Sequence, residues 1–201
     1  MSLWALHTTK VSTLMTAKSV AQIEISPWLL RFAPLIPKEG LVLDLACGSG
    51  RHSHYLAGLG HPVVAVDRDA AALEVLQTAM IETRTLDLET DTWPFKEDRF
   101  AAIVVTNYLY RPYMSRLPEM LVDGGILIYE TFAAGNELYG KPSNPDFLLN
   151  SGELLAFALQ HGLKVIAYED IYVEQPKPAM IQRICVVKGA LKGRIPLQFV
   201  G

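Results

Sequence analysis

The chain has 201 residues, of which 50% are hydrophobic and 19% are charged, a composition typical of a globular protein. Its formal net charge of -3 gives no strongly basic surface for neutralising phosphates, which argues against nucleic acid as a partner. Two cysteines are too few for a four-cysteine zinc site, and we predict no bound metal. No apolar run approaches the ~20 residues that span a bilayer, so we predict no membrane partner. The N-terminus lacks the apolar block of a signal peptide, and we expect a cytoplasmic protein.

The N-terminal part is predicted to be a helical accessory segment, residues 1–37, within a single domain that spans residues 1–201. Its first 25 residues show only weak periodicity. Ser26 followed by Pro27 has the form of a helix N-cap with proline at the first helical position. Two downstream prolines should end this short helix.

From residue 41 onward, apolar runs alternate with helix-like segments. We predict strands at residues 41–45, 63–66, 83–86, 101–106, 126–131, 164–172 and 181–187. The continuous apolar runs among them are typical of strands that are buried on both faces of a parallel sheet. We predict helices at residues 51–59, 69–80, 113–122 and 152–160. Pro118 is expected to kink or shorten the third of these helices.

Alternation at this spacing predicts an α/β fold with a doubly wound, Rossmann-like, mostly parallel seven-stranded sheet. Only residues 173–179 separate the last two strands, so we expect them to form an antiparallel hairpin at the edge of the sheet. A turn is predicted at residues 123–125, before the fifth strand, and a polar loop at residues 134–146 after it. Such a loop is either a functional lid or a plain surface connection.

The most informative segment is LDLACGSGR, residues 43–51, between the first strand and its helix. Its glycines let the backbone turn sharply and approach a ligand without a Cβ in the way. The helix that follows offers free N–H groups to an anionic group such as a carboxylate. Nineteen residues after Gly48, Asp67 ends the second strand, where its carboxylate can accept hydrogen bonds from both ribose hydroxyls of an adenosine.

Two residues distinguish a dinucleotide site from a site for S-adenosylmethionine (SAM). The dinucleotide fingerprint has a third glycine where this chain has Ser53. Asp44, just before the loop, would place negative charge near a pyrophosphate, whereas it suits a ligand with an ammonium and a sulfonium group. The pattern therefore favours SAM over the cofactor of an NAD(P)-linked dehydrogenase.

The same segments resemble the motifs of class I SAM-dependent methyltransferases. The matching segments are residues 43–50 (motif I), 64–67 (the second motif), 86–88 (the adenine-contacting acid after the third strand), 93–104 (the "PF…FD" entry into the fourth strand) and 123–127 (the "PGG" turn). Ala101 stands where the family has the aspartate, and Asp123 where it has the proline. The resemblance spans roughly residues 26–188, and residues 47–57 are most similar to small bacterial methyltransferases of the tellurite-resistance type.

This resemblance implies an enzyme whose cofactor is SAM. The implied roles are methionine binding for Asp44, Gly48 and Gly50, ribose binding for Asp67, adenine contact for Asp87 and Leu88, and proximity to the methyl donor for Asn107. Ala46, Arg51 and His52 complete the predicted cofactor site on the loop side, although a histidine in this first helical turn is also a candidate for simple packing. Arg68 is either a contact at the adenine edge or a solvated surface charge.

On the acceptor side, the candidate catalytic residues follow the fourth and fifth strands and are Glu130, Asn107 and Tyr108. Methyl transfer needs a general base only if the nucleophile loses a proton, and Glu130 is our candidate for it. The alternative role of Glu130 is an ion pair with Arg111 or a capping contact. Tyr108, Tyr110 and Tyr139 either shape an aromatic acceptor pocket or belong to the core.

The function predicted from the sequence is SAM-dependent methylation of a small-molecule acceptor that the residues do not identify. One alternative is a SAM-binding sensor or scaffold without turnover, and another is an RNA or protein methyltransferase. An Asn-Pro-Pro-Tyr type tetrapeptide, typical of adenine-amino methyltransferases, does not follow the fourth strand, where the chain reads NYLY. The oligomeric state stays open.

Overall fold

The computed structural model describes residues 24–190 except 77, 91 and 96. Most of the predicted accessory segment, residues 1–23, and the last part of the chain, residues 191–201, lie outside the described residues. The strands are β1 (Val42–Leu45), β2 (Val63–Asp67), β3 (Ile81–Thr85), β4 (Phe100–Thr106), β5 (Leu121–Phe132), β6 (Lys164–Val173) and β7 (Ala179–Val187). They form one sheet in the order β3-β2-β1-β4-β5-β7-β6, in which only β7 runs antiparallel to its neighbours.

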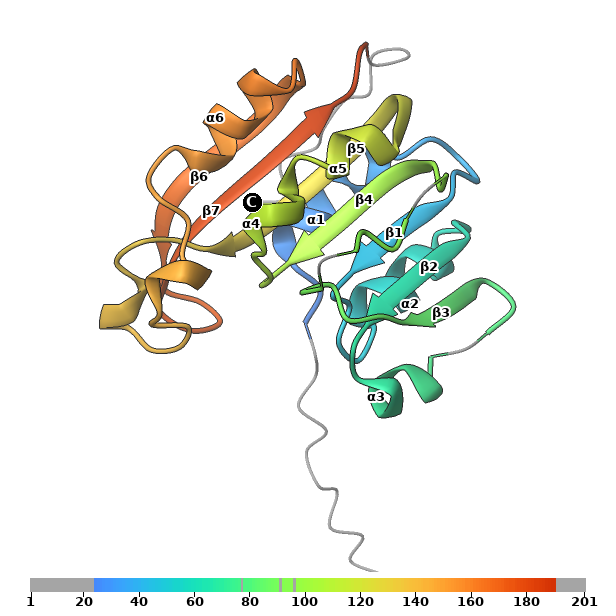
Figure 1. Ribbon diagram of the computed structural model, residues 1–201, viewed down its shortest axis with the longest axis horizontal. Helices are drawn as coiled ribbons and strands as arrows, with labels where there is room; N and C mark the ends of the chain where they lie inside the picture. The colour runs from blue at the N-terminus through green and yellow to red at the C-terminus, as the bar shows by residue number, and fades with distance from the viewer. Residues whose placement is uncertain (1–23, 77, 91, 96, 191–201) are drawn as a thin grey trace, which may run out of the picture.

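Helices cover both faces of this sheet (Figure 1). On one face lie α1 (Pro27–Phe32), the 3-10 turn η1 (Ala33–Leu35), α2 (Arg51–Gly58) and α3 (Ala70–Glu74). On the other lie α4 (Arg111–Met114), α5 (Leu117–Met120) and α6 (Glu153–Gln160). A hydrophobic cluster fills each of the two interfaces, because the central strands are apolar on both sides. The predicted doubly wound α/β fold is confirmed.

Helix α1 begins as its sequence predicts. The hydroxyl oxygen of Ser26 accepts hydrogen bonds from the backbone N–H groups of Trp28 and Leu29, and Pro27 occupies the first turn, where no N–H is required. Three side chains of this six-residue helix, Trp28, Leu29 and Phe32, are buried against the sheet. Each such burial contributes about 2 kcal/mol, so packing rather than length holds the helix in place.

Helix α3 is much shorter than the predicted helix at residues 69–80, and it ends at Glu74. The prediction was wrong because β3 pairs with β2 from Ile81, which lies opposite Val63. The chain therefore has to reverse over the preceding residues, and an isolated bridge between Thr78 and Ile81 closes that reversal. Tertiary strand pairing has overridden the helix propensity of an Ala/Leu/Met-rich segment.

The helix predicted at residues 113–122 is shortened, as Pro118 led us to expect, and the chain forms the two separate helices α4 and α5 in its place. Pro118 lies in the first turn of α5, where its missing N–H costs nothing, so it helps to start a helix instead of kinking one. Strand β5 begins at Leu121 and runs through the predicted turn at residues 123–125. Within it, Gly124 has a φ of 80°, and the pairing with β4 shifts register.

The predicted edge hairpin is confirmed, since β6 and β7 pair antiparallel from Val173 opposite Ala179 down to Lys164 opposite Val187. The predicted polar loop contains two short 3-10 turns, η2 (Asn136–Leu138) and η3 (Pro145–Phe147). None of the helices in the described part of the chain has the length and apolarity that crossing a membrane requires.

Strand order reverses between β1 and β4. From β1 the sheet continues through β2 to β3, and from β4 it continues through β5 in the opposite direction. Chain connections therefore leave the two adjacent carboxyl ends toward opposite sides, and a crevice opens between them. Ligands of open α/β sheets bind at this position, so the fold places the candidate site between the segments that follow Leu45 and Thr106.

Helix α1 provides a test of the core. Truncation of the fully buried Phe32 to alanine should lower the free energy of unfolding by about 3–5 kcal/mol, because it removes an aromatic side chain and leaves a cavity. Leu30→Ala, on the solvent side of the same helix where the leucine is 42% exposed, is the matched control and should cost less than about 1 kcal/mol. Urea titration followed by circular dichroism measures both. Equal losses would contradict the packing described for α1.

Candidate functional site

Left-handed backbone conformations gather on both sides of the crevice. Ala46, after β1, has a φ of 56° and Asn107, after β4, has a φ of 55°. Non-glycine residues pay about 1–2 kcal/mol for this conformation, and such strain concentrates at functional sites. The backbone on each side is held in place: Cys47 N–H donates to the Val66 carbonyl, and Asn107 N–H donates to the Glu130 carbonyl, both at 2.9 Å.

The two glycines of the loop serve different purposes. Gly48 and Gly50 both have positive φ values, 55° and 71°. A Cβ at Gly50 would overlap the side chain of Leu76, so this glycine is required for packing as well as for its backbone conformation. A Cβ at Gly48 would meet nothing within 4 Å, which means that its backbone faces open space. That open side is where a ligand can approach the loop.

Asp67 contacts the glycine loop directly. One carboxylate oxygen of Asp67 accepts a hydrogen bond from Gly48 N–H at 2.7 Å, and the other accepts one from Asp69 N–H at 3.0 Å. Asp69 in turn caps α3 by accepting from Ala71 and Ala72 N–H. The strand-terminal acid and the loop thus meet through a direct hydrogen bond.

Asp44 is buried beneath the loop with one oxygen left without a partner. Its exposed fraction is 1%, its Oδ2 accepts a hydrogen bond from the Ser53 hydroxyl at 2.6 Å, and its Oδ1 has no hydrogen-bond partner. Burial raises the pKa of Asp44 to about 6, against the opposing effects of the Ser53 hydrogen bonds and the Arg51 charge. A buried acceptor without a donor costs about 1–3 kcal/mol, so the site is poised for a ligand that brings a donor.

Ser53 was considered from the sequence only as a departure from the dinucleotide fingerprint. The structure gives it a specific role, because its hydroxyl is the protein hydrogen-bond donor to the Asp44 carboxylate. A serine nine residues after an acid is not a recognisable pattern on its own. The pairing becomes visible only once the first turn of α2 is packed against β1.

The side chains of Arg51 and His52 face away from the loop. Arg51 donates to the carbonyl of Glu24 at 3.1 Å. The His52 ring is buried, accepts a hydrogen bond from Ser26 N–H at 3.2 Å and lies 3.1 Å from the Thr106 hydroxyl. Burial lowers the pKa of His52 to about 4, and the nearby Arg51 charge acts in the same direction. A ligand in the crevice would meet His52 through its backbone.

The predicted catalytic residues do not form one cluster. Glu130 lies on the face covered by α1, where it accepts a hydrogen bond from the Ser26 hydroxyl at 2.8 Å and pairs with Arg183 at 3.2 Å. Tyr108 packs against the hydrophobic cluster of the opposite face. The alternative ion pair between Glu130 and Arg111 is wrong, since Arg111 instead makes a two-pronged contact with Glu153 at 2.7 and 2.9 Å.

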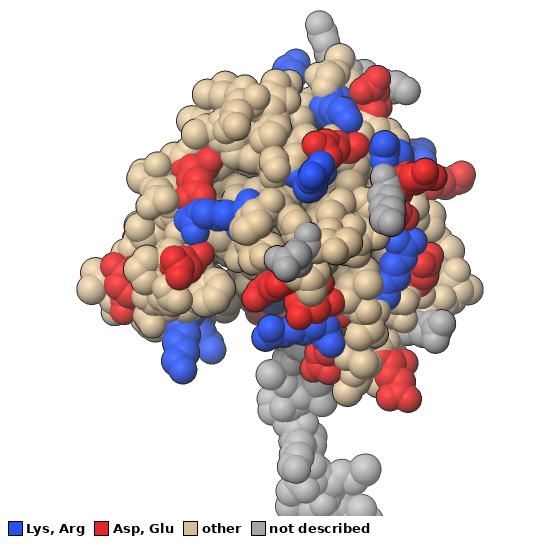
Figure 2. Space-filling view, in the orientation of Figure 1, with Lys and Arg blue, Asp and Glu red and all other residues tan. Residues whose placement is uncertain are grey.

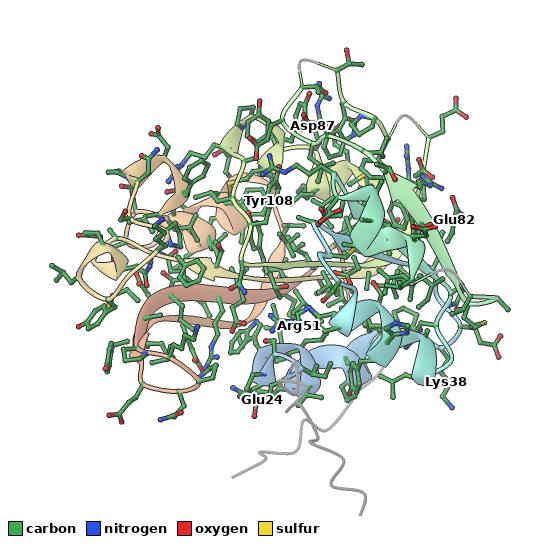
Figure 3. The ribbon with its side chains drawn as sticks, turned by 90° about the horizontal axis from the view of Figure 1, so that it is seen from below. Glu24, Lys38, Arg51, Glu82, Asp87 and Tyr108 are labelled. Carbon is green, nitrogen blue, oxygen red and sulfur yellow. The ribbon has the colours of Figure 1, made fainter. Side chains whose placement is uncertain are left out.

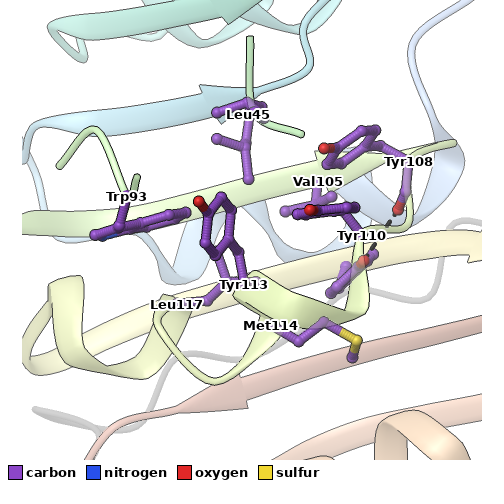
Figure 4. Close-up of a pocket in the computed structure, with 10 residues that line it drawn as sticks. Leu45, Trp93, Val105, Tyr108, Tyr110, Tyr113, Met114 and Leu117 are labelled. Atoms are coloured by element: carbon purple, nitrogen blue, oxygen red, sulfur yellow. Dashed lines mark hydrogen bonds between the residues drawn. The ribbon is translucent and has the colours of Figure 1, made fainter. Parts of the chain in front are cut away.

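An aromatic pocket lies beside the crevice on the face of α4 and α5 (Figure 4). It is lined by Leu45, Leu88, Trp93, Val105, Tyr108, Tyr110, Tyr113, Met114, Leu117 and Tyr129. Its free volume of about 10 Å³ is room for a single water molecule. Tyr129 donates from its hydroxyl to the carbonyl of Tyr108 at 2.9 Å, which fixes the segment after β4 against the pocket wall. Half of these ten residues lie outside the motifs and candidates that the sequence singled out, namely Val105, Tyr113, Met114, Leu117 and Tyr129.

Tyr108 brings a polar group into this pocket. Its hydroxyl is buried and has no hydrogen-bond partner. Burial raises the pKa of Tyr108 above its ordinary value, and the charges of Glu89 and Asp87 act in the same direction. Leu88 is buried in the pocket wall, whereas Asp87 and Arg68 are exposed at the carboxyl ends of β3 and β2.

Tyr139 does not join the aromatic pocket, although the sequence placed it there as a candidate. It is 47% exposed and its ring packs on Tyr172 of β6, with centroids 5.1 Å apart. The loop that carries it is held by Asn136, which donates to the Pro142 carbonyl and accepts from Met180 N–H. The loop therefore packs on the edge hairpin.

Asp44 and His52 give opposite contributions to the pH dependence of stability. Folding raises the pKa of Asp44 from 3.8 to about 6, so between these pH values the folded chain binds a proton that the unfolded chain has released. The free energy of unfolding therefore rises, through this group, as pH falls through 6. Folding lowers the pKa of His52 from 6.5 to about 4, so between these pH values the unfolded chain binds a proton that the folded chain does not. The free energy of unfolding therefore falls, through this group, as pH falls through 6.5. Each shift corresponds to about 3 kcal/mol, at about 1.4 kcal/mol for each pH unit.

We therefore expect Asp44→Asn to be more stable than the original chain at pH 8, by up to about 3 kcal/mol, with an advantage that shrinks as pH falls from 6 to 4. His52→Gln should show the opposite trend, with its stability relative to the original chain rising over the same interval. Urea unfolding at a series of pH values gives both difference curves. Flat curves would contradict the burial of these two groups.

Comparison with known proteins agrees with this geometry. Residues 42–125 match the family model described as a methyltransferase domain. The chain shares its fold with TehB from Haemophilus influenzae, at 20% identity and a TM-score of 0.69, over 85% of this chain and 65% of that one. The chain thus spans about two thirds of the length of TehB. A comparison with curated proteins gives no match.

Two further solved structures have the same fold. A TehB-like SAM-dependent methyltransferase from Corynebacterium glutamicum is 20% identical, with a TM-score of 0.60 over 82% of this chain and 89% of that one. A 1,6-didemethyltoxoflavin-N1-methyltransferase from Burkholderia thailandensis is 18% identical, with a TM-score of 0.59 over 81% of this chain and 76% of that one. The comparisons thus show a match to a methyltransferase domain over residues 42–125 and a fold shared with TehB-like SAM-dependent methyltransferases.

Proposed function

We propose that the crevice between β1 and β4 binds SAM and that the enzyme transfers its methyl group to a small-molecule acceptor. The observation that carries this proposal is the unpartnered Oδ1 of Asp44, buried beneath a glycine loop that is open at Gly48. The amino group of the SAM methionine moiety is a donor of the kind that this carboxylate lacks. The Burkholderia relative, whose structure contains S-adenosylhomocysteine (SAH), supports the choice of ligand.

We assign the other parts of the SAM molecule to the remaining candidate residues. Gly48 and Gly50 give the methionine end access to the first turn of α2, whose N-terminal N–H groups suit its carboxylate. Asp67 is our candidate for the ribose hydroxyls. Asp87, Leu88 and the aromatic pocket are our candidates for the adenine, with Arg68 at its exposed edge.

SAM supplies an activated methyl group on its sulfonium, so the protein has mainly to position the acceptor and exclude water. Asn107, whose backbone is held by Glu130 at the carboxyl end of β4, is our candidate for the contact with the methyl donor. Glu130 already engages Ser26 and Arg183, so abstracting a proton would require it to leave one of these partners. We therefore propose positioning as the main contribution of Glu130 and keep proton abstraction as its secondary role.

A small acceptor agrees with the charge of the surface. Lys and Arg side chains alternate with Asp and Glu on the face drawn in Figure 2. This mixture does not favour a long polyanion such as RNA. Among the relatives, the Burkholderia structure contains 1,6-didemethyltoxoflavin, which is a small molecule, whereas another relative, MtfA, is described as a glycopeptide N-methyltransferase.

Calorimetric titration tests the cofactor site. SAM and SAH should bind the purified protein and NAD should not. Asp44→Asn and Asp67→Ala should each weaken SAH by about 10–100-fold, the loss expected for a hydrogen bond to a charged group. Asp123→Ala changes an exposed aspartate at the other end of the sheet and should bind SAH as the original chain does. Binding of NAD alone would overturn the proposal.

The hydroxyl of Tyr108 gives a second test. Tyr108→Phe removes a buried group without a partner, so the free protein should keep or gain stability. If this hydroxyl forms a hydrogen bond with the adenosyl group of the ligand, the same variant should bind SAH several-fold more weakly. Tyr139→Phe, at an exposed tyrosine of the loop that packs on the edge hairpin, serves as the control for both measurements. Unchanged SAH affinity in Tyr108→Phe would assign the pocket to the core.

A further inference from the structure

The imidazole of His52 joins three elements that border the crevice. Its Nε2 lies 3.2 Å from the backbone nitrogen of Ser26, and its Nδ1 lies 3.1 Å from the Thr106 hydroxyl. A backbone N–H can only donate, so Nε2 is the acceptor and the ring proton is on Nδ1, from which it is donated to Thr106. Both nitrogens of this ring, which is only 2% exposed, are thus committed to protein partners.

His52 and Thr106 lie on the two sides of the cofactor crevice. His52 is the second residue of α2 and comes two residues after Gly50, which ends the glycine loop. Thr106 is the last residue of β4, and Asn107 follows it in a left-handed conformation. The bond between His52 and Thr106 therefore spans the place where the sheet order reverses. It ties the glycine loop to the segment that carries the proposed methyl-donor contact.

The side of His52 away from the crevice is braced by α1. Ser26 donates from its hydroxyl to Glu130 at 2.8 Å, and Glu130 pairs with Arg183 at 3.2 Å. Arg183 also pairs with Glu169 at 2.6 Å and lies over the ring of Trp28, with its guanidinium carbon 4.7 Å from the centroid. Because these contacts connect Ser26 to residues of β5, β6 and β7, Ser26 holds the His52 ring in a fixed position.

A second bond holds the same segment against α2. Arg51, next to His52, donates to the carbonyl of Glu24 at 3.1 Å. In the view of Figure 3, Arg51 lies between Glu24 and Tyr108, with Asp87 beyond Tyr108. The segment that enters α1 is thus bonded to the first turn of α2 at two successive residues, through Glu24 and Ser26.

We propose that His52 is a positioning residue for the cofactor: its imidazole sets the separation between the glycine loop and Asn107 without touching the ligand. This inference rests on the proposed function, in which the crevice binds SAM. Displacement of a positioned group by about 1 Å can cost about two orders of magnitude in rate, so a side chain outside the ligand's contact surface can control the site.

Paired variants separate positioning from packing. His52→Leu keeps an apolar side chain in the buried space but loses both hydrogen bonds, and we expect SAH to bind about tenfold more weakly by calorimetry. Glutamine offers an acceptor and a donor on one amide group, so His52→Gln should stay within about threefold of the original affinity. At the other end of the bond, Thr106→Val should weaken SAH by about threefold to tenfold, and Thr106→Ser, which keeps the hydroxyl, should not.

Ile126→Val is the control for a loss of stability alone, because Ile126 is buried in the hydrophobic cluster on the face of α1 and α2 and pairs with Ala102, four residues before Thr106 on β4. It should lower the midpoint of thermal unfolding and leave SAH affinity unchanged. If His52→Leu does not fold, the SAH affinities of Thr106→Val and Thr106→Ser test the positioning role instead.

Equal SAH affinity in His52→Leu and the original chain, or equal losses in His52→Leu and His52→Gln, would overturn the positioning role while the proposed function stands. The positioning role is also overturned if Thr106→Val and Thr106→Ser bind SAH equally well. Failure of the original chain to bind SAH would overturn the proposed function, and the inference with it. Rescue by glutamine and by serine, with the Ile126→Val control unchanged, is the result that we expect.

Discussion

The reversal of strand order between β1 and β4 is the constraint on which the rest of the site depends. Because the chain leaves these two adjacent strands toward opposite faces, their carboxyl ends are not covered by a common connection. The proposed contacts with the methionine moiety and the methyl donor follow from these two ends, whereas those with the ribose and adenine come from the ends of β2 and β3. The glycine loop and Asp44 belong to β1, whereas Asn107 and the aromatic segment after it belong to β4.

The site concentrates unfavourable features that the core has to offset. Ala46 and Asn107 are left-handed, Asp44 buries an oxygen without a donor, and the Tyr108 hydroxyl is buried without a partner. The free energy of burying two hydrophobic clusters, one on each face of the sheet, offsets these unfavourable contributions. A ligand that satisfies the buried groups recovers part of this cost as binding free energy, which is how preorganised sites convert stability into affinity.

Sequence reasoning succeeded where the determining residues are local. The glycine loop, Asp67 at the end of its strand and the edge hairpin each depend on a short stretch of chain, and each is found where its pattern predicts. Sequence reasoning failed where the pairing of strands determines the local structure. The pairing of β3 with β2 ends the helix predicted at residues 69–80 early, and β5 replaces the turn predicted at residues 123–125. The contacts of His52 and Ser53 could not be anticipated either, since both arise only when α2 packs on the sheet.

The position of β7 has a consequence for how the protein is made. Strand β7 lies between β5 and β6 in the sheet, yet it follows both of them in the sequence. During synthesis, β6 emerges from the ribosome first and has no neighbour to pair with until residues 179–187 follow. Arg183, which anchors Glu130 and so the support behind α1, arrives in the same stretch. The nascent chain can therefore form β1 to β5 early, but the backing of the crevice is completed only once β7 has followed β6.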